Sequence, residues 1–390
     1  MKNIYLILSF FISILSFGQS NVGYTLIDKK IAEIPNNLAN STDDIAKYIN
    51  TNFKTENDKI RAVFYWTASN ISYDIRNMFA DISMESSQEM IIKALKTRKG
   101  VCIHYAEVFN ELSKKVGIES YIIDGYTKQN EKIDKIAHAW CAAKIDNQWY
   151  VFDPTWGSGF VNKGVFTKKM NNYFFKAEPN KIITSHMPFD YLWQFLNYPI
   201  SNTEFYEGKT QINNAKKHFD FEKEIARQNS LTEIDQLFES AERIEGNGLK
   251  NAMIVERYEG KKKQLTYLRQ NENIDKLNAI VTEMNEAVAL LNDFIFYRNN
   301  KFRPDLPDEE ISNMIQKPRE KLIKCQNDIY KINSIGKENA SNLSSMKKSI
   351  EANVASAEEH AAFVKNYLSK SKIIRKTMFS KVSWFGVPLN

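Results

Sequence analysis

The spacing of hydrophobic positions changes along the chain and separates a mixed N-terminal half from a helical C-terminal half. In the N-terminal half, hydrophobic residues first recur every three or four positions, as in amphipathic helices. Ser41 and Thr55 precede two of these runs, and both are residue types that cap helix N-termini. Two further helices are expected, one over residues 88–96 and one that begins at Cys102.

After Gly117 the pattern becomes typical of β-strands. Three strands are expected over residues 119–126, 136–145 and 148–152, and the last two are joined by a tight turn at residues 146–147. Helices followed by an antiparallel sheet indicate an α+β fold.

The C-terminal half has a helical pattern throughout. Seven hydrophobic residues keep a spacing of three and four, namely Ile274, Leu277, Val281, Met284, Val288, Leu291 and Ile295. Such a stripe predicts the core of a helical bundle or coiled coil rather than a cofactor site. Pro304, Pro307 and Gly336 are expected to divide this region into long helices joined by short turns.

The first residues have the features of a secretory signal. Lys2 is followed by an apolar stretch over residues 4–17, and Ser16 and Gly18 are small residues suited to cleavage before Gln19. An uncleaved membrane anchor is the alternative. We expect export to the periplasm or secretion, with no membrane span after cleavage, because no later segment has about 18 consecutive apolar residues. The expected parts are a signal peptide (1–18), a catalytic domain (19–210) and a helical domain (211–390).

Composition adds little to this picture. The 390 residues include 53 Lys and Arg against 47 Asp and Glu, so the formal net charge is +6. Hydrophobic residues make up 43% of the chain and charged residues 26%, which is close to the globular average. No nucleic-acid partner is therefore expected. The three cysteines, Cys102, Cys141 and Cys325, are too few for a disulfide scaffold, so their chemistry needs another explanation.

Cys102, His138 and Asp153 occur in the order of a nucleophile, a base and an orienting acid. Cys102 falls in the first turn of a helix, where free backbone N–H groups favour a thiolate. The turn at residues 146–147 sets Trp140 opposite Asp153, which makes Asp153 the diagonal neighbour of His138, with Cα atoms about 7–8 Å apart. We therefore predict a Cys–His–Asp catalytic triad.

The same residues could also form a zinc site or a disulfide. Cys102, His104, His138 and Cys141 contain the ligand types of a zinc site, but strand alternation points His138 and Cys141 to opposite faces. A Cys102–Cys141 disulfide is disfavoured because Cys141 faces away from the site. No metal and no other cofactor is expected. His104 is as well explained by a packing or surface role as by a role in catalysis.

These residues lie in motifs that resemble the transglutaminase-like superfamily of papain-related cysteine enzymes. The matching blocks are residues 100–102 with 105–106, 138–140 and 149–157, preceded by 65–66 and 71–74. Residues 173–174, 186–188 and 193–194 resemble the branch that includes kyphoscoliosis peptidase. The resemblance implies a papain-like core and catalytic roles for Cys102, His138 and Asp153. Ile103 and His104 depart from the pattern of many relatives, which puts the fit of the substrate in doubt.

The remaining site residues are less specific. We expect the backbone N–H of Cys102 to be one oxyanion donor, with Trp66 or Gln88 as candidates for the second. Trp140 and Trp156 are expected to line the cleft, although a role in the core is as well supported for both.

The triad implies attack on a carboxamide to form a thioester, which water or an amine then resolves. We favour an exported peptidase or amide hydrolase acting on a peptide or protein. A protein crosslinker that transfers glutamine acyl groups to amines is one alternative. A catalytically silent scaffold is the other. In each case the helical region can bind a protein partner or self-associate.

Overall fold

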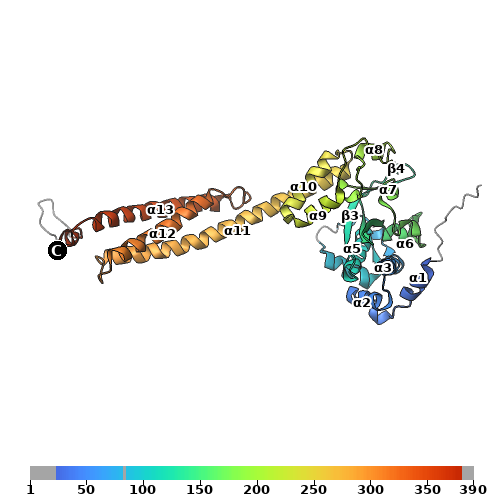
Figure 1. Cartoon of the computed structure of the whole chain (residues 1–390), viewed down its shortest axis with the longest axis horizontal. Coiled ribbons are helices and arrows are strands. Elements are labelled where there is room, and N and C mark those ends of the chain that lie inside the picture. Colours follow the sequence, from blue (N-terminus) through green and yellow to red (C-terminus); the bar gives the residue numbers. More distant parts are fainter. Residues whose placement is uncertain (1–22, 82–84, 380–390) are drawn as a thin grey trace, which may run out of the picture. The chain divides into compact units, whose positions relative to one another are not determined.

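The computed structural model describes residues 23–81 and 85–379, so the predicted signal peptide lies outside the described residues. The chain divides into two compact units, which are described separately (Figure 1). The first comprises the described residues up to Thr232 together with Glu239–Glu259, and the second comprises Glu233–Phe238 and the described residues from Gly260. The boundary predicted after residue 210 falls inside the first unit, and it stays a prediction.

Four helices precede the central helix of the first unit, and local sequence explains where they begin. They are α1 (Thr25–Ala32), α2 (Thr42–Asn52), α3 (Glu56–Asn70) and α4 (Ser87–Thr97). As predicted, the Ser41 and Thr55 side chains accept backbone N–H groups at the starts of α2 and α3. Ser86 and Glu89 form a capping box at α4.

The sheet is antiparallel and follows the predicted register. Its strands are β3 (Ser120–Gln129), β4 (Lys132–Ile133), β5 (His138–Ile145), β6 (Gln148–Phe152) and β9 (His186–Pro188). The order is β4-β3-β5-β6, and β9 also pairs with β3. Ile145 lies opposite Gln148, and both residues of the intervening turn have positive φ, as a tight hairpin requires.

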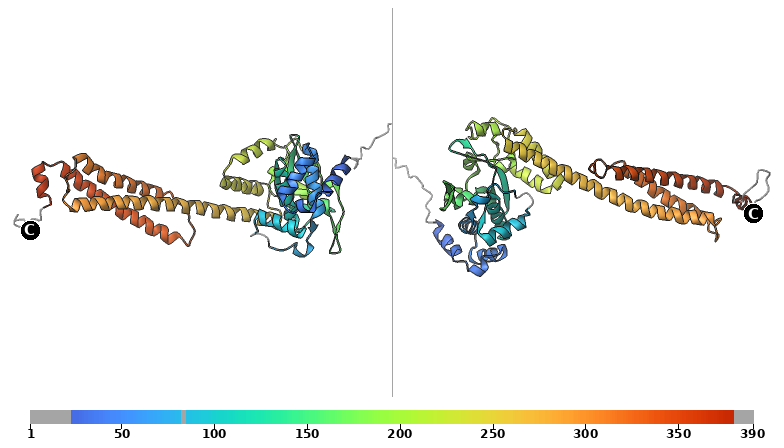
Figure 2. Two further views of the ribbon diagram at one scale, coloured as in Figure 1. Left: turned by 90° about the horizontal axis from the view of Figure 1, so that it is seen from below. Right: turned by 180° about the vertical axis from the view of Figure 1, so that it is seen from behind.

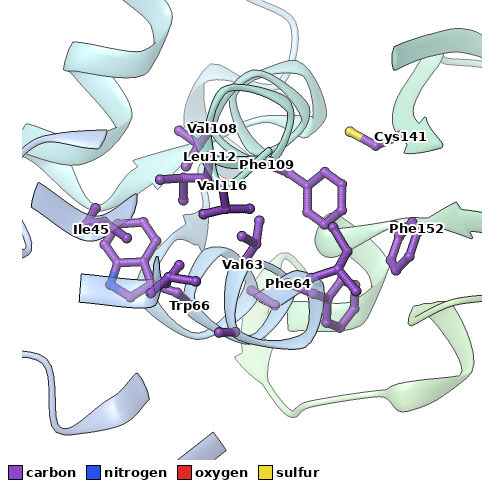
Figure 3. Close-up of a cluster of buried hydrophobic side chains, with 14 of the residues drawn as sticks. Ile45, Val63, Phe64, Trp66, Val108, Phe109, Leu112, Val116, Cys141 and Phe152 are labelled. Carbon is purple, nitrogen blue, oxygen red and sulfur yellow. The ribbon is translucent and has the colours of Figure 1, made fainter. Parts of the chain in front are cut away.

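The central helix α5 (Cys102–Lys115) packs between α3 and one face of the sheet, and these contacts form the main core of the first unit (Figure 3). Val63 and Phe64 of α3 meet Phe109 of α5, and Phe109 stacks against Phe152 of β6 at 5.2 Å. Cys141 lies on this same face of β5, whereas Trp140 belongs to a separate cluster. The two residues therefore face opposite sides of the sheet.

Short elements complete the first unit around the sheet. They are β1 (Ser72–Tyr73), β2 (Lys99–Gly100), α6 (Pro154–Ser158), β7 (Gly159–Asn162), β8 (Val165–Lys168), α7 (Pro179–Ile182), α8 (Asn202–Tyr206) and α9 (Phe221–Ser230). Strands β1 and β2 form a parallel pair, and β7 and β8 form an antiparallel hairpin. Helices α10 (Glu233–Gly246) and α11 (Ala252–Asn299) have residues in both units.

The second unit is helical, as predicted. Helices α12 (Asp308–Ile329) and α13 (Ala340–Leu368) run beside α11 in all three views, and α14 (Lys372–Thr377) follows (Figures 1 and 2). Met284 and Leu291 of the predicted stripe are buried in the shared core. The helices end near the predicted breaks. None of the described helices is long and apolar enough to cross a membrane.

Candidate active site

Cys102 is the first residue of α5 and is partly exposed. Val101 caps the helix, and the Nδ1 atom of His104 accepts the Val101 backbone N–H at 3.3 Å. A Cβ atom at Gly100 would lie 2.5 Å from the Cβ of His104, so this position has no room for a side chain. His104 therefore has a local structural role: it is buried and fixes the turn that presents the thiol.

His138 and Asp153 meet at the ends of β5 and β6. The Nε2–H of His138 donates to Oδ2 of Asp153 at 2.7 Å, and both side chains are buried. The pairing of β5 with β6 stops at Cys141 and Phe152, so Asp153 is not the strand partner of Trp140. Asp153 instead caps α6, and its Oδ1 accepts the N–H groups of Thr155 and Trp156. The carboxylate is therefore held by a helix N-terminus as well as by the sheet.

The charges of the three residues are coupled. Burial alone raises the pKa of the Cys102 thiol, but the hydrogen bond and positive charge of His138, with a hydrogen bond at the Ala139 backbone, bring it below its ordinary value. Burial lowers the pKa of His138, and the Asp153 carboxylate outweighs burial and raises it to about 10. Burial raises the pKa of Asp153, but His138 and His186 hold it well below the usual range. The arrangement favours a thiolate beside an imidazolium.

His186 is a fourth member of this cluster that the triad prediction missed. Its Nε2–H donates to Oδ2 of Asp153 at 3.1 Å, and its Nδ1 is 2.8 Å from the Ser185 hydroxyl, which donates to it. Burial keeps the pKa of His186 below its ordinary value, so the ring is neutral. Its position in the 186–188 motif was the available signal, but only the pairing of β9 with β3 brings it to Asp153.

The two predicted cleft tryptophans have different surroundings. Both rings contact the His138 ring, with centroids 5.9 Å away for Trp140 and 5.5 Å away for Trp156. Trp140 is almost fully buried beneath the site. Trp156 lines a cavity of about 770 Å³ that His138 also lines, so it is the tryptophan that faces the cleft. Thr155 lines the same cavity, and its hydroxyl oxygen is buried and has no hydrogen-bond partner among the described residues.

The structure does not bring Trp66 or Gln88 to this cleft. Trp66 lies on the face of α3 that packs into the core near Ile45, so it has no exposed surface (Figure 3). The Arg98 guanidinium covers its ring at 5.0 Å. Gln88 is exposed on α4 and lines a different cavity of about 490 Å³. Neither side chain is therefore placed to serve as an oxyanion donor at this cleft.

Among the described residues, His138, Asp153 and His186 form a group whose donor atoms lie within 4.8 Å of one another. These types of ligand suit zinc or a similar divalent cation. In this structure the same atoms hydrogen-bond one another. The alternative cysteine and histidine set is not assembled, because Cys141 points to the core and lies 3.4 Å from the Ala106 carbonyl oxygen. All three cysteines are free.

Comparisons with known proteins agree with this geometry. Residues 43–154 match the family model of the transglutaminase-like superfamily. Kyphoscoliosis peptidase of Mus musculus is 29% identical over 162 residues, which are 38% of this chain and 23% of the relative. Cytokinesis protein 3 of Schizosaccharomyces pombe is 24% identical over 176 residues, which are 43% of this chain and 19% of the relative.

The chain thus spans a quarter or less of the length of these curated relatives. A crystal structure of a TGase aligns with 60% of this chain and 53% of its own at 17% identity, with a TM-score of 0.27, which is too low to bear on the fold. The family match contains Cys102, His138 and Asp153. Residues 43–154 thus form a transglutaminase-like domain, and this part of the chain resembles the branch that includes kyphoscoliosis peptidase.

Proposed function

We propose that the chain is a cysteine enzyme that hydrolyses a peptide bond or side-chain carboxamide through a thioester on Cys102. The observation that carries this proposal is the hydrogen bond of His138 to Asp153, with His138 at the wall of a cavity and acting on Cys102 so that its thiol pKa is lowered. A buried structural cysteine would instead have a raised thiol pKa, as burial produces at Cys141.

The geometry assigns each residue a step. The Cys102 thiolate attacks the carbonyl carbon, and the imidazolium of His138 gives its proton to the departing amine. Neutral His138 then takes a proton from water as the water oxygen attacks the thioester. The Cys102 thiolate leaves, and the imidazolium is restored. Asp153 keeps the ring oriented and compensates its positive charge throughout.

Two observations favour a peptide-like substrate. Thr155 lines the cleft, and its buried hydroxyl has no hydrogen-bond partner among the described residues, so a rotation of this side chain toward the cleft would let it bind a backbone amide. The name kyphoscoliosis peptidase supports hydrolysis over transfer, although that relative is much longer than the part that matches. Water is available to every thioester in an open cleft, whereas a crosslinker also needs a site for the acceptor amine.

One experiment separates the acyl fates. The protein is mixed with glutamine-containing peptides and a fluorescent primary amine, with Cys102→Ala as the control. We expect peptide cleavage or release of ammonia that disappears in Cys102→Ala. Incorporation of the amine into the peptides would instead show that the protein is a crosslinker and not a hydrolase. The absence of both reactions would contradict the proposal and favour a scaffold role.

We further propose that the protein is exported and that its helical region engages a protein partner or a second copy. Export predicts a mature N-terminus at Gln19, which N-terminal sequencing of the native protein tests. Light scattering of the purified full chain tests self-association.

A further inference from the structure

Tyr73 lies beside the segment that leads to Cys102 and is a candidate for the second oxyanion donor. Strand β1 pairs in parallel with β2, so Tyr73 lies opposite Gly100, two residues before Cys102. The Asp74 backbone N–H donates to the Gly100 carbonyl at 3.0 Å and holds this pairing in place. Tyr73 is therefore fixed beside the segment that leads into the N-terminus of α5.

The Tyr73 side chain faces the cleft. It lines the same cavity as His138, is half-buried, and lies against Phe166 with ring centroids 6.4 Å apart. Within residues 23–81 and 85–379, no hydrogen bond occupies its hydroxyl. The phenol is therefore a free donor at the edge of the reaction site.

Burial and the negative charge of the site keep this phenol protonated. Burial, followed by the negative charges of Cys102 and Asp153, raises the pKa of Tyr73 to about 12. The hydroxyl thus retains its proton at neutral pH, and it is near enough to the thiolate to respond to its charge. A protonated phenol can donate a hydrogen bond to an anion that forms there.

We propose that the Tyr73 hydroxyl is the second oxyanion donor, acting with the backbone N–H of Cys102, an inference that rests on the proposed thioester chemistry. When Sγ of Cys102 bonds to the carbonyl carbon, the C=O π pair moves to oxygen. The two donors bind that oxygen. The pair returns as the leaving group departs, and Tyr73 keeps its proton throughout.

The test uses two reactions of the same thiolate. Acylation by p-nitrophenyl acetate passes through an oxyanion and releases nitrophenolate, whereas alkylation by iodoacetamide displaces iodide and forms no oxyanion. In Tyr73→Phe we expect the first acylation of Cys102 to slow by roughly 10²-fold. The alkylation rate should stay the same, which also shows that the variant is folded. Tyr173→Phe is the matched control, because Tyr173 is 58% exposed and does not line the cleft.

The other possible results refute either the proposed function or the role of Tyr73. If the wild-type thiol reacts with neither reagent, or with iodoacetamide alone, the proposed function fails. If the wild type undergoes both reactions and Tyr73→Phe changes neither, the Tyr73 assignment is wrong. If Tyr73→Phe slows both reactions equally, Tyr73 supports the thiolate or the fold, and the oxyanion role is likewise refuted.

The walls of the cleft carry a second inference that does not depend on Tyr73. Six lining residues are aliphatic, Met or Phe, namely Met78, Phe160, Val161, Phe166, Met170 and Phe174. Phe160 and Val161 belong to the β7–β8 hairpin and are each about half exposed. Lys169 is the one formally charged Lys, Arg, Asp or Glu side chain in the described lining.

We infer that this wall binds a large apolar side chain of the acyl substrate, again on the basis of the proposed function. Binding is favoured because the apolar surface of such a side chain is removed from water. His138 lines the same cavity, so a side chain bound there shares the cavity with the catalytic histidine.

Competing p-nitrophenyl phenylacetate and p-nitrophenyl acetate measure this preference as a ratio of acylation rates. We expect wild type to favour phenylacetate and Phe160→Ala to reduce the ratio several-fold. Val165→Ala, on the same hairpin but outside the lining, should leave it unchanged. The inference is refuted if wild type shows no preference for phenylacetate, or if Phe160→Ala leaves the ratio unchanged. In either case, normal alkylation of Cys102 would leave the proposed function intact.

Discussion

Replacing Asp153 by Asn tests how the site sustains its charges. The carboxylate is almost fully buried, and its two oxygens accept four N–H groups, from His138, His186, Thr155 and Trp156. An amide has nearly the same shape but only one oxygen, so its NH2 group must face donors on one side. The substitution removes both the negative charge and half of the acceptors.

The size of the effect follows from His138. Burial lowers the pKa of this imidazole, and Asp153 raises it from an ordinary 6.5 to about 10. At about 1.4 kcal/mol for each pKa unit, this net rise favours the imidazolium by roughly 5 kcal/mol, and the Asp153 carboxylate contributes more to the rise than Cys102 does. Without it, burial leaves His138 neutral at pH 7, and the Cys102 thiolate loses the positive charge that stabilises it.

The assay is the rate at which iodoacetamide alkylates Cys102 between about pH 5 and about pH 10, since only the thiolate reacts. The wild type should stay reactive below the ordinary thiol pKa. Asp153→Asn should lose reactivity at acidic pH and regain it as the pH rises and the thiol ionises unaided. Circular dichroism confirms that the variant is folded. Superimposable pH profiles in a folded variant would refute the electrostatic reasoning.

Two further predictions concern stability. His186→Ala should lower the free energy of unfolding by roughly 2 kcal/mol, because the buried Asp153 carboxylate loses a charge-assisted hydrogen bond. His186→Gln keeps an N–H donor and should lose less stability in urea denaturation. Equal losses in the two variants would contradict this role. Gly125→Ala should cost about 1–3 kcal/mol, since its Cβ would lie 2.2 Å from the Met187 carbonyl oxygen. Gly260→Ala is the matched control, because no atom lies within 4 Å of its Cβ, and it should stabilise α11 by up to about 1 kcal/mol. Similar shifts in melting temperature for the two alanine variants would contradict the packing argument.

Local signals in the sequence were sufficient for much of the fold. The side chains of Ser41 and Thr55 cap helices as their types predict, and the turn at residues 146–147 sets the register of β5 and β6. These features depend on neighbours within a few positions. The hydrophobic stripe of the C-terminal region was also sufficient to predict a helical core there, because helical periodicity indicates which face of a helix is buried.

The parts of the site that were missed depend on contacts between distant segments. His186 reaches Asp153 only through the pairing of β9 with β3, and Tyr73 reaches the cleft only through β1 and β2. Trp66 was a reasonable donor by type, but its position on α3 directs it into the core. The pairing of strands that are distant in sequence, and the side of a helix that faces the core, decide where these side chains lie. Neither can be read from the spacing of residues in a single sequence.

The central claim is that His138 holds Cys102 as a thiolate, and one measurement tests it directly. The rate of iodoacetamide alkylation at Cys102 is compared at mildly acidic pH in wild type and in His138→Ala. Cys141 and Cys325 are buried, so the quantity that decides is the pH dependence at Cys102 and not the selectivity among thiols. We predict rapid labelling in wild type that His138→Ala abolishes at this pH and that returns only as the pH rises. Equal rates in the two proteins at mildly acidic pH would contradict the account.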